Sequence, residues 1–167
     1  MIEILPEDPC RDASEIEALY DCTFGPGHFA KTAERLREGS SSLPDLSRVA
    51  RANGCVIGVC RLWPLKVGGD AVGAVFFGPL AVDPAYQGEG VGQRIIHHCI
   101  AAATEAGWPA GVIIGAREYF EGLGFSAQHA DLLTFPGPQD VNRVMTIGLA
   151  DTNVTLRGLV RADKAVC

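Results

Sequence analysis

The stretch Leu80-Ala81-Val82-Asp83-Pro84-Ala85-Tyr86-Gln87-Gly88-Glu89-Gly90-Val91-Gly92 decides the fold of this chain. An apolar segment leads into a short turn, then into a loop with glycine at every second position, and then into an amphipathic helix. Glycine lets a backbone approach a ligand closely, because it carries no Cβ. The helix that follows begins with unpaired N–H groups and the positive end of its dipole. The stretch therefore predicts a phosphate-binding site at a helix N-terminus.

The residues around the three glycines exclude two commoner glycine loops. No Lys-Ser or Lys-Thr pair follows Gly92, so the loop is not a P-loop, and the glycine spacing does not fit the dinucleotide pattern G-x-G-x-x-G. The segment Gln87-Gly88-Glu89-Gly90-Val91-Gly92 instead resembles the acetyl-CoA signature of the GNAT superfamily of N-acetyltransferases, Gln/Arg-x-x-Gly-x-Gly/Ala. Every fixed position of that signature is matched.

Two further segments carry the same resemblance, which covers roughly residues 1–150. Gly78-Pro79-Leu80-Ala81-Val82 precedes the glycine loop, and Tyr119-Phe120-Glu121-Gly122-Leu123-Gly124-Phe125 follows it, as in a bacterial group of the superfamily. The resemblance implies an α/β (α+β) GNAT fold, with a mixed, mostly antiparallel central sheet flanked by helices. In that fold the sheet is splayed at the acetyl-CoA site, which corresponds here to the strands over 75–82 and 111–115.

Local patterns predict an element order of β-α-α-β-β-β-α-β-α-β-β, which is the order of that family. Asn53-Gly54 is a strong hairpin signal between two of the strands. Strands are expected over 2–5, 46–52, 55–67, 71–82, 111–115, 126–135 and 144–149. Helices are expected from an N-cap at Asp12 or Ser14 to Phe24, and over 29–38, 91–106 and 117–122. Residues 1–150 are expected to form one GNAT domain, and 151–167 a C-terminal extension for which an edge strand is one interpretation.

Composition and charge indicate a soluble globular protein and argue against nucleic acids and membranes as partners. The chain has 167 residues, 47% hydrophobic and 20% charged, and its net charge of −6 argues against nucleic acid. No apolar run approaches the ~18 residues of a membrane span. The N-terminus lacks the basic and apolar regions of a signal peptide, so a cytoplasmic location is expected. The six cysteines have no zinc spacing, so no metal is expected, and Cys55, Cys60 and Cys99 are expected to be reduced, buried thiols.

Acetyl-CoA is the cosubstrate that the resemblance implies. Its pyrophosphate is expected on backbone N–H groups between Gly88 and Gly92, with a further hydrogen bond from the Gln87 side-chain amide. By the resemblance, backbone groups of residues 80–82 pair with the pantetheine arm. Glu89 is interpreted as a complement to the helix dipole rather than as a base. The expected cofactor-binding residues are Leu80, Ala81, Val82, Gln87, Gly88, Glu89, Gly90, Val91, Gly92 and Gln93.

The catalytic groups are marked less clearly. Many GNAT members carry a Glu base on the strand that here reads Val75-Phe76-Phe77-Gly78-Pro79, and this segment has no carboxylate, so the base is unassigned. The family commonly places a Tyr acid four residues before the Gly of its final "GF", a position that is Phe120 here. The adjacent Tyr119 is the candidate general acid, with a packed aromatic as the alternative. The weaker candidates for a catalytic role are His28, His97, His98, His129 and Asp131.

The resemblance implies transfer of the acetyl group of acetyl-CoA directly to a primary amine of a small molecule or peptide, without an acyl-enzyme. The acceptor is expected between the segments 20–45 and 134–143. Acidic residues such as Glu38, Asp131 and Asp140 are expected to attract a cationic amine. The alternative is a non-catalytic acyl-CoA-binding or sensing module, because the Glu is missing and the Tyr is shifted. Nucleic acid and membranes are not expected partners, and a homodimer is left open.

Overall fold

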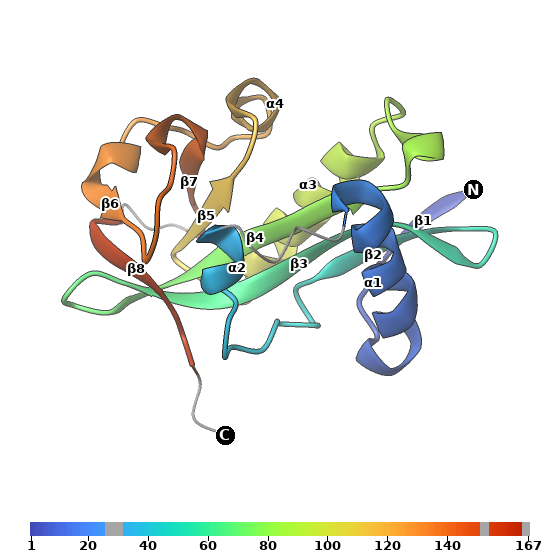
Figure 1. Cartoon of the computed structure of the whole chain (residues 1–167), viewed down its shortest axis with the longest axis horizontal. Coiled ribbons are helices and arrows are strands. Elements are labelled where there is room, and N and C mark those ends of the chain that lie inside the picture. Colours follow the sequence, from blue (N-terminus) through green and yellow to red (C-terminus); the bar gives the residue numbers. More distant parts are fainter. Residues whose placement is uncertain (26–31, 151–153, 165–167) are drawn as a thin grey trace.

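The central sheet of the computed structural model has the strand order β1-β2-β3-β4-β5-β7 and is antiparallel except between β4 and β5 (Figure 1). The structure describes residues 1–25, 32–150 and 154–164. The strands are β1 Ile2–Pro6, β2 Arg48–Ala52, β3 Cys55–Val67, β4 Val72–Val82, β5 Ala110–Ile114, β6 Leu133–Thr134, β7 Val144–Gly148 and β8 Gly158–Ala162. The helices are α1 Pro9–Phe24, α2 Thr32–Arg35, α3 Val91–Glu105 and α4 Arg117–Glu121, with 3₁₀ turns at η2 Pro84–Tyr86, η3 Ala130–Leu132 and η4 Val141–Arg143. The predicted mixed, mostly antiparallel sheet flanked by helices is confirmed.

The meander of β2, β3 and β4 forms the middle of this sheet. Asn53 and Gly54 both have positive φ, of 52° and 81°, which is the geometry that a two-residue hairpin turn requires. Ala52 pairs with Cys55 across that turn, so the predicted hairpin is confirmed. The long strands β3 and β4 then carry the sheet from the α1 end of the molecule to β5 (Figure 1).

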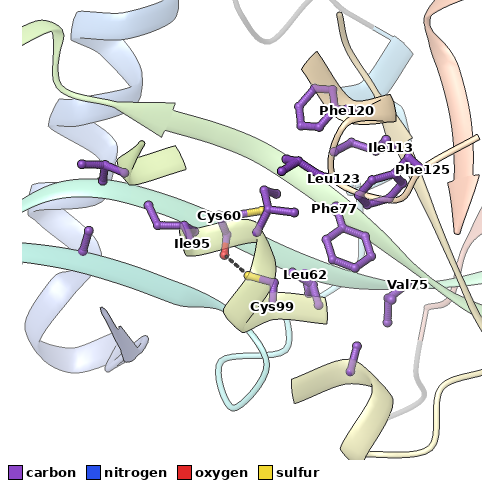
Figure 2. Packing of buried hydrophobic residues seen from close by; sticks show 14 of the residues in the cluster. Cys60, Leu62, Val75, Phe77, Ile95, Cys99, Ile113, Phe120, Leu123 and Phe125 are labelled. Carbon is purple, nitrogen blue, oxygen red and sulfur yellow. Dashed lines mark hydrogen bonds between the residues drawn. The ribbon is translucent and has the colours of Figure 1, made fainter. Parts of the chain in front are cut away.

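Helices α1 and α3 pack on opposite faces of the meander, because successive residues of a strand point to opposite sides of a sheet. Val49 of β2 lies in one core cluster with Ile16 of α1, whereas the next residue, Ala50, lies in another with Ile95 of α3. Figure 2 shows the α3-side cluster, which extends from Ile95 past the buried thiols to the aromatic rings near α4. Helices α1 and α3 therefore support the strands of the site described below from both faces of the sheet.

The N-cap of the first helix lies four residues before Asp12, the earlier of the two predicted caps, Asp12 and Ser14. Asp8 is the N-cap, and its side chain accepts hydrogen bonds from the backbone N–H groups of Cys10 and Arg11. Pro9 occupies the first helical position, where its missing N–H costs nothing. Asp12 is instead buried inside the first turn, where it accepts from Asp8 N and pairs with Arg51 of β2. A carboxylate with a buried cationic partner is not available as a cap.

Three other local predictions differ from the structure. The strand expected over 126–135 is reduced to one bridge between Ser126 and Thr146, a turn, a 3₁₀ segment and the two-residue β6. After the bridge, the Ser126 hydroxyl accepts from Gln128 N, which takes this N–H group away from strand pairing. Within the described residues the second helix is only Thr32–Arg35, and its expected start at residue 29 lies outside them. Cys60 and Cys99 are buried free thiols as predicted, but Cys55 is exposed beside the hairpin turn.

The C-terminal segment adds a strand to this architecture. β8 pairs antiparallel with the end of β3, at Leu65–Val67, and parallel with β6. Val160 of β8 and Leu156 before it are buried in a cluster with Leu65 and Phe76. Among the described residues, no helix has the length and apolar character that crossing a membrane requires.

Candidate functional site

The candidate site is centred where β4 and β5 part (Figure 1). The two strands pair in parallel only over Val75–Phe77 and Gly111–Ile113. β4 runs on to Val82, whereas the chain after β5 turns toward the β7 side, where Gly115 N donates to the carbonyl oxygen of Arg143 at 2.9 Å. In the part of the chain that the structure describes, the second half of β4 has no β5 partner. The predicted splay of the sheet is therefore present.

Two aromatic side chains fix the β4 backbone at the start of the splay. Trp63 Nε1 donates to the carbonyl oxygen of Gly78 at 2.8 Å, and the Tyr20 hydroxyl donates to that of Pro79 at 3.3 Å. Burial raises the pKa of Tyr20, so its phenol stays protonated and able to donate. The register of the β3–β4 pairing shifts at this point, as in a β-bulge. These hydrogen bonds direct both carbonyl groups of the bulge toward protein partners.

The glycine loop leaves open space around its backbone. Gly88 and Gly90 have φ of 83° and 78°. Apart from the residues adjacent in the chain, no heavy atom lies within 4 Å of the position that a Cβ would take on either glycine. Gly90 is the N-cap of α3 in a left-handed conformation, and no side chain caps the helix. The first hydrogen bond of the helix is from Arg94 N to Gly90 O, at 3.1 Å. The backbone N–H groups of the first turn of α3 therefore have no side-chain cap, and this end of the helix is accessible to a ligand.

Two side chains of the loop lie differently from the prediction. The Gln87 amide nitrogen donates to the carbonyl oxygen of Val82 at 3.0 Å, so in this structure it holds the loop to the end of β4. Glu89 precedes the N-cap and lies outside the first turn of α3, where it was expected to complement the dipole. Gln93 lies in that first turn and is exposed. Their roles toward acetyl-CoA stay predictions.

Tyr119 and Phe120 of α4 point to different sides of the splay. The Tyr119 hydroxyl lies 2.6 Å from the position that a Cβ would take on Gly92, and the side chains of Leu80 and Val82 border the same position. Glycine at 92 is therefore needed for the close approach of this phenol to the start of α3. Desolvation raises the pKa of Tyr119, and the neighbouring Cys60 thiol contributes in the same direction.

Phe120, at the position where the family commonly has a Tyr, is buried and lines a cavity on the other side. Its ring packs so tightly on Gly115 that a Cβ there would lie 2.4 Å from a ring carbon. Phe120 contacts Tyr119 edge to face, with ring centroids 4.9 Å apart. The splay thus has a phenol on its glycine-loop side and a phenyl ring on its cavity side.

The cavity has a volume of about 600 Å³, which is in the range of small-molecule sites. It is formed by the end of α1, α2, the second half of β4, the end of β5, α4 and the segment before β7. Its lining residues are Phe24, Ala33, Arg37, Phe76, Phe77, Gly78, Pro79, Leu80, Ile113, Ile114, Gly115, Ala116, Phe120, Pro138, Gln139, Asp140 and Arg143. The walls are therefore mainly apolar, and the charges are confined to three residues.

The three charged residues of the cavity differ in their partners. Arg37 is half-buried; it pairs with Glu34, and its guanidinium lies 5.7 Å from the centroid of the Trp63 ring. Asp140 accepts a hydrogen bond from Asn142 N at 2.9 Å through one carboxylate oxygen. The guanidinium of Arg143 has no hydrogen-bond or ion-pair partner among the residues that the structure describes.

Only some of the residues considered for catalysis or for attracting the amine lie at the cavity. His97, His98, His129 and Asp131 are exposed, and none of them lines the cavity. His28 lies outside the described residues. Of the acidic residues expected to attract an amine, Asp140 lines the cavity, whereas Glu38 and Asp131 do not. The sequence pointed to the segment 134–143 as part of the acceptor site but contained no motif that would have singled out Arg143.

Known proteins share this architecture over most of the chain. Residues 13–125 match the model of the acetyltransferase (GNAT) family. The chain belongs to this family. The uncharacterized N-acetyltransferase YhbS of Escherichia coli K12 is 32% identical to this acetyltransferase over 136 residues, or 80% of each chain. The uncharacterized N-acetyltransferase YjhQ of the same organism is 30% identical over 132 residues, which are 78% of this chain and 72% of YjhQ.

Solved structures of related acetyltransferases superpose closely on this GNAT enzyme. YhbS from Escherichia coli in complex with CoA has a TM-score of 0.79 at 30% identity, over 98% of this chain and 89% of YhbS. A GNAT family acetyltransferase from Brucella melitensis in complex with acetyl-CoA has a TM-score of 0.71 at 27% identity, over 96% of this chain and 95% of that one. The fold and the enzyme class predicted from the glycine loop are confirmed.

Proposed function

We propose that this acetyltransferase binds acetyl-CoA along the glycine loop and the splay, and transfers the acetyl group to a primary amine bound in the cavity. One observation carries the proposal. Leu80, Ile114 and Gly115, which lie where β4 and β5 part, also line the cavity. A thioester held along the splay is thereby placed next to an acceptor held in the cavity.

The residues present fit the cosubstrate. The uncapped end of α3 offers N–H groups and a positive dipole to a pyrophosphate, and the open space at Gly88 and Gly90 lets the phosphates come close. Beyond the Gly78 and Pro79 carbonyl groups, which already have protein partners, the side of β4 without a β5 partner can offer backbone groups to the amides of a pantetheine arm. The complexes of the two related acetyltransferases with CoA and acetyl-CoA support the same assignment.

The reaction needs little covalent chemistry from the protein. Acetyl-CoA, when bound, supplies the thioester whose acetyl group is transferred. A base takes one proton from the acceptor ammonium, and the neutral nitrogen then forms the new C–N bond as the C–S bond breaks. The nitrogen loses a second proton as it becomes an amide nitrogen, and the departing sulfur takes one proton from an acid, so that one proton is released overall. The Cys60 and Cys99 thiols are buried, hydrogen-bond to backbone carbonyl oxygens and do not line the cavity. The hydrogen bond with the Cys99 thiol and burial raise the pKa of Cys60, which disfavours its thiolate, so we infer a direct transfer without an acyl-enzyme.

Asp140 and Tyr119 are the residues that we assign to the two proton transfers. Among the described residues that line the cavity, Asp140 is the one that carries a carboxylate. We therefore assign it to take a proton from the acceptor, directly or through one water. Tyr119 lies at the splay between Gly92 and Leu80, on the side of the glycine loop. Its raised pKa keeps it protonated, as a general acid for the departing thiolate requires.

The alternative function is a module that binds acyl-CoA without turnover. The absence of a carboxylate from residues 75–79 and the phenyl ring at Phe120 are the observations in its favour. The two functions are separated by a thiol-release assay with a broad panel of amines, in which the acetylated product is identified by mass. Release of CoA in step with an acetylated amine is the expected result. Saturable acetyl-CoA binding without release for any amine would establish the binding module instead.

The pH dependence tests Asp140 as the base. The rate is expected to rise with pH as the acceptor ammonium loses its proton, because only the neutral amine attacks. Asp140→Asn is expected to lower kcat about 10-fold near pH 7, less than a fully enclosed base would contribute, because Asp140 is exposed and water can replace it. The loss should shrink toward high pH, where the free amine forms in solution. Asp131→Asn, an exposed carboxylate away from the cavity, is the control.

A deficit in Asp140→Asn that stays constant from pH 7 to the pKa of the acceptor would contradict this assignment. A constant deficit would instead indicate that Asp140 only shapes the segment before β7, where its side chain caps η4.

A further inference from the structure

The described residues that line the acceptor cavity give it an apolar interior and one cation without a protein partner, Arg143. Four phenyl rings contribute to its walls, from Phe24, Phe76, Phe77 and Phe120. These rings favour an acceptor with an aromatic or branched aliphatic body, because each apolar group that they cover leaves water. A volume of about 600 Å³ holds such a body together with a polar head.

Arg37 is not available as the recognition cation. Its Nη2 pairs with Glu34, its Nε donates to the Ala33 carbonyl oxygen at 3.3 Å, and its guanidinium lies over the Trp63 ring. Desolvation lowers the pKa of Arg37, and the Glu34 carboxylate opposes that shift. The charge of Arg37 is therefore balanced by protein groups, and its side chain forms part of the cavity wall.

Arg143 is held at the cavity by its backbone while its guanidinium is left without a partner. Arg143 N donates to the Asp140 carbonyl oxygen at 3.0 Å, and the Arg143 carbonyl oxygen accepts from Gly115 N at 2.9 Å. These two bonds tie the residue to η4 and to the end of β5, beside the splay. Within residues 1–25, 32–150 and 154–164, no carboxylate pairs with its side chain, although the whole chain has a net charge of −6. The planar guanidinium is the side chain best suited to bind a carboxylate through two parallel hydrogen bonds.

We propose that the acceptor is an amino carboxylate with a large apolar side chain, whose carboxylate binds to Arg143 while its amine faces the splay. The proposal rests on the proposed acetyl transfer and names its substrate class. The expected attraction of a cationic amine by acidic residues is kept for Asp140, and a carboxylate on the same acceptor is added. Asp140, three residues before Arg143, then lies on the same edge of the cavity and receives the ammonium proton.

Matched pairs of acceptors test this inference. Each pair consists of an amino acid and the amine that lacks only its carboxylate: phenylalanine with 2-phenylethylamine, leucine with 3-methylbutylamine, and tryptophan with tryptamine. In the thiol-release assay, at least one amino acid is expected to have a kcat/KM about 10- to 100-fold above that of its amine, which is the range for hydrogen bonds to a charged group. Arg143→Gln is expected to remove this preference, mainly through KM, by lowering the rate with the amino acid far more than the rate with the amine. Arg143→Lys is expected to keep part of it.

Arg157→Gln is the matched control, because Arg157 is exposed and does not line the cavity. A second readout does not depend on turnover: the N-acetylated amino acid, added with CoA, should raise the melting temperature of the wild type and of Arg157→Gln but not of Arg143→Gln. Equal rates within every pair, or an equal loss in both members on Arg143→Gln, would overturn the inference while acetyl transfer stands. If no amine of the broad panel is acetylated, the proposed function is wrong, and this inference, which rests on it, is wrong as well.

Discussion

Acetyl-CoA at a hundred times its dissociation constant is expected to raise the free energy of unfolding by about 2.7 kcal/mol, and Gly90→Val is expected to abolish this gain. Gly90 is the N-cap of α3 at a φ of 78°, with open space where a ligand is expected. A valine side chain would fill that space and strain the backbone, because β-branched residues rarely adopt positive φ. Thermal and denaturant unfolding with and without acetyl-CoA measure the difference.

The backbone strain needs its own control, because Gly90→Val is expected to destabilise the free protein as well. Gly54→Val supplies it: Gly54 has a φ of 81° and equally open surroundings, but lies in the hairpin turn between β2 and β3. Gly54→Val should lose a similar amount of stability and keep the full response to acetyl-CoA. A folded Gly90→Val protein that still binds acetyl-CoA with unchanged affinity would show that the cosubstrate binds elsewhere.

Tyr119→Phe is expected to lower kcat about 100-fold, the lower end of what general acid catalysis contributes, with little change in acetyl-CoA affinity. The substitution removes only the hydroxyl that approaches Gly92 and leaves the ring that contacts Phe120. Because the pKa of Tyr119 is raised, the phenol stays protonated beyond the pH of about 10 at which a free tyrosine titrates. An alkaline fall in kcat is therefore expected only above that pH in the wild type, and not in Tyr119→Phe.

The double variant Tyr119→Phe/Phe120→Tyr moves the hydroxyl to the position that the family commonly uses. Phe120 lines the cavity, so this hydroxyl would approach the splay from the acceptor side. Partial recovery of kcat would support proton donation by either position. Full activity of the single Tyr119→Phe variant would assign the proton to water, and a rise in KM alone would make Tyr119 a binding residue.

Local signals in the sequence were sufficient for the backbone of the glycine loop and of the hairpin between β2 and β3. A glycine at φ 78° that begins a helix, and an Asn-Gly pair at positive φ, are conformations that adjacent residues determine almost by themselves. The same reasoning failed at the start of α1, where the burial of Asp12 against Arg51 decided which of two aspartates caps the helix. It failed again over residues 126–135, where a hydroxyl competes with strand pairing.

The sequence by itself determined the family and the splayed strands, because those features follow from contiguous residues and from their resemblance to GNAT proteins. The resemblance also predicted the acceptor between the segments 20–45 and 134–143, but only the tertiary structure decided the make-up of this acceptor side. Its cavity joins residues from the end of α1 to the segment before β7, and no local pattern links Phe24 with Arg143. Packing across the sheet also decided that Phe120 faces the cavity while Tyr119 faces Gly92. Whether a charged side chain is paired, as Arg37 is, or lacks a partner among the described residues, as Arg143 does, depends on which distant residues the fold brings beside it.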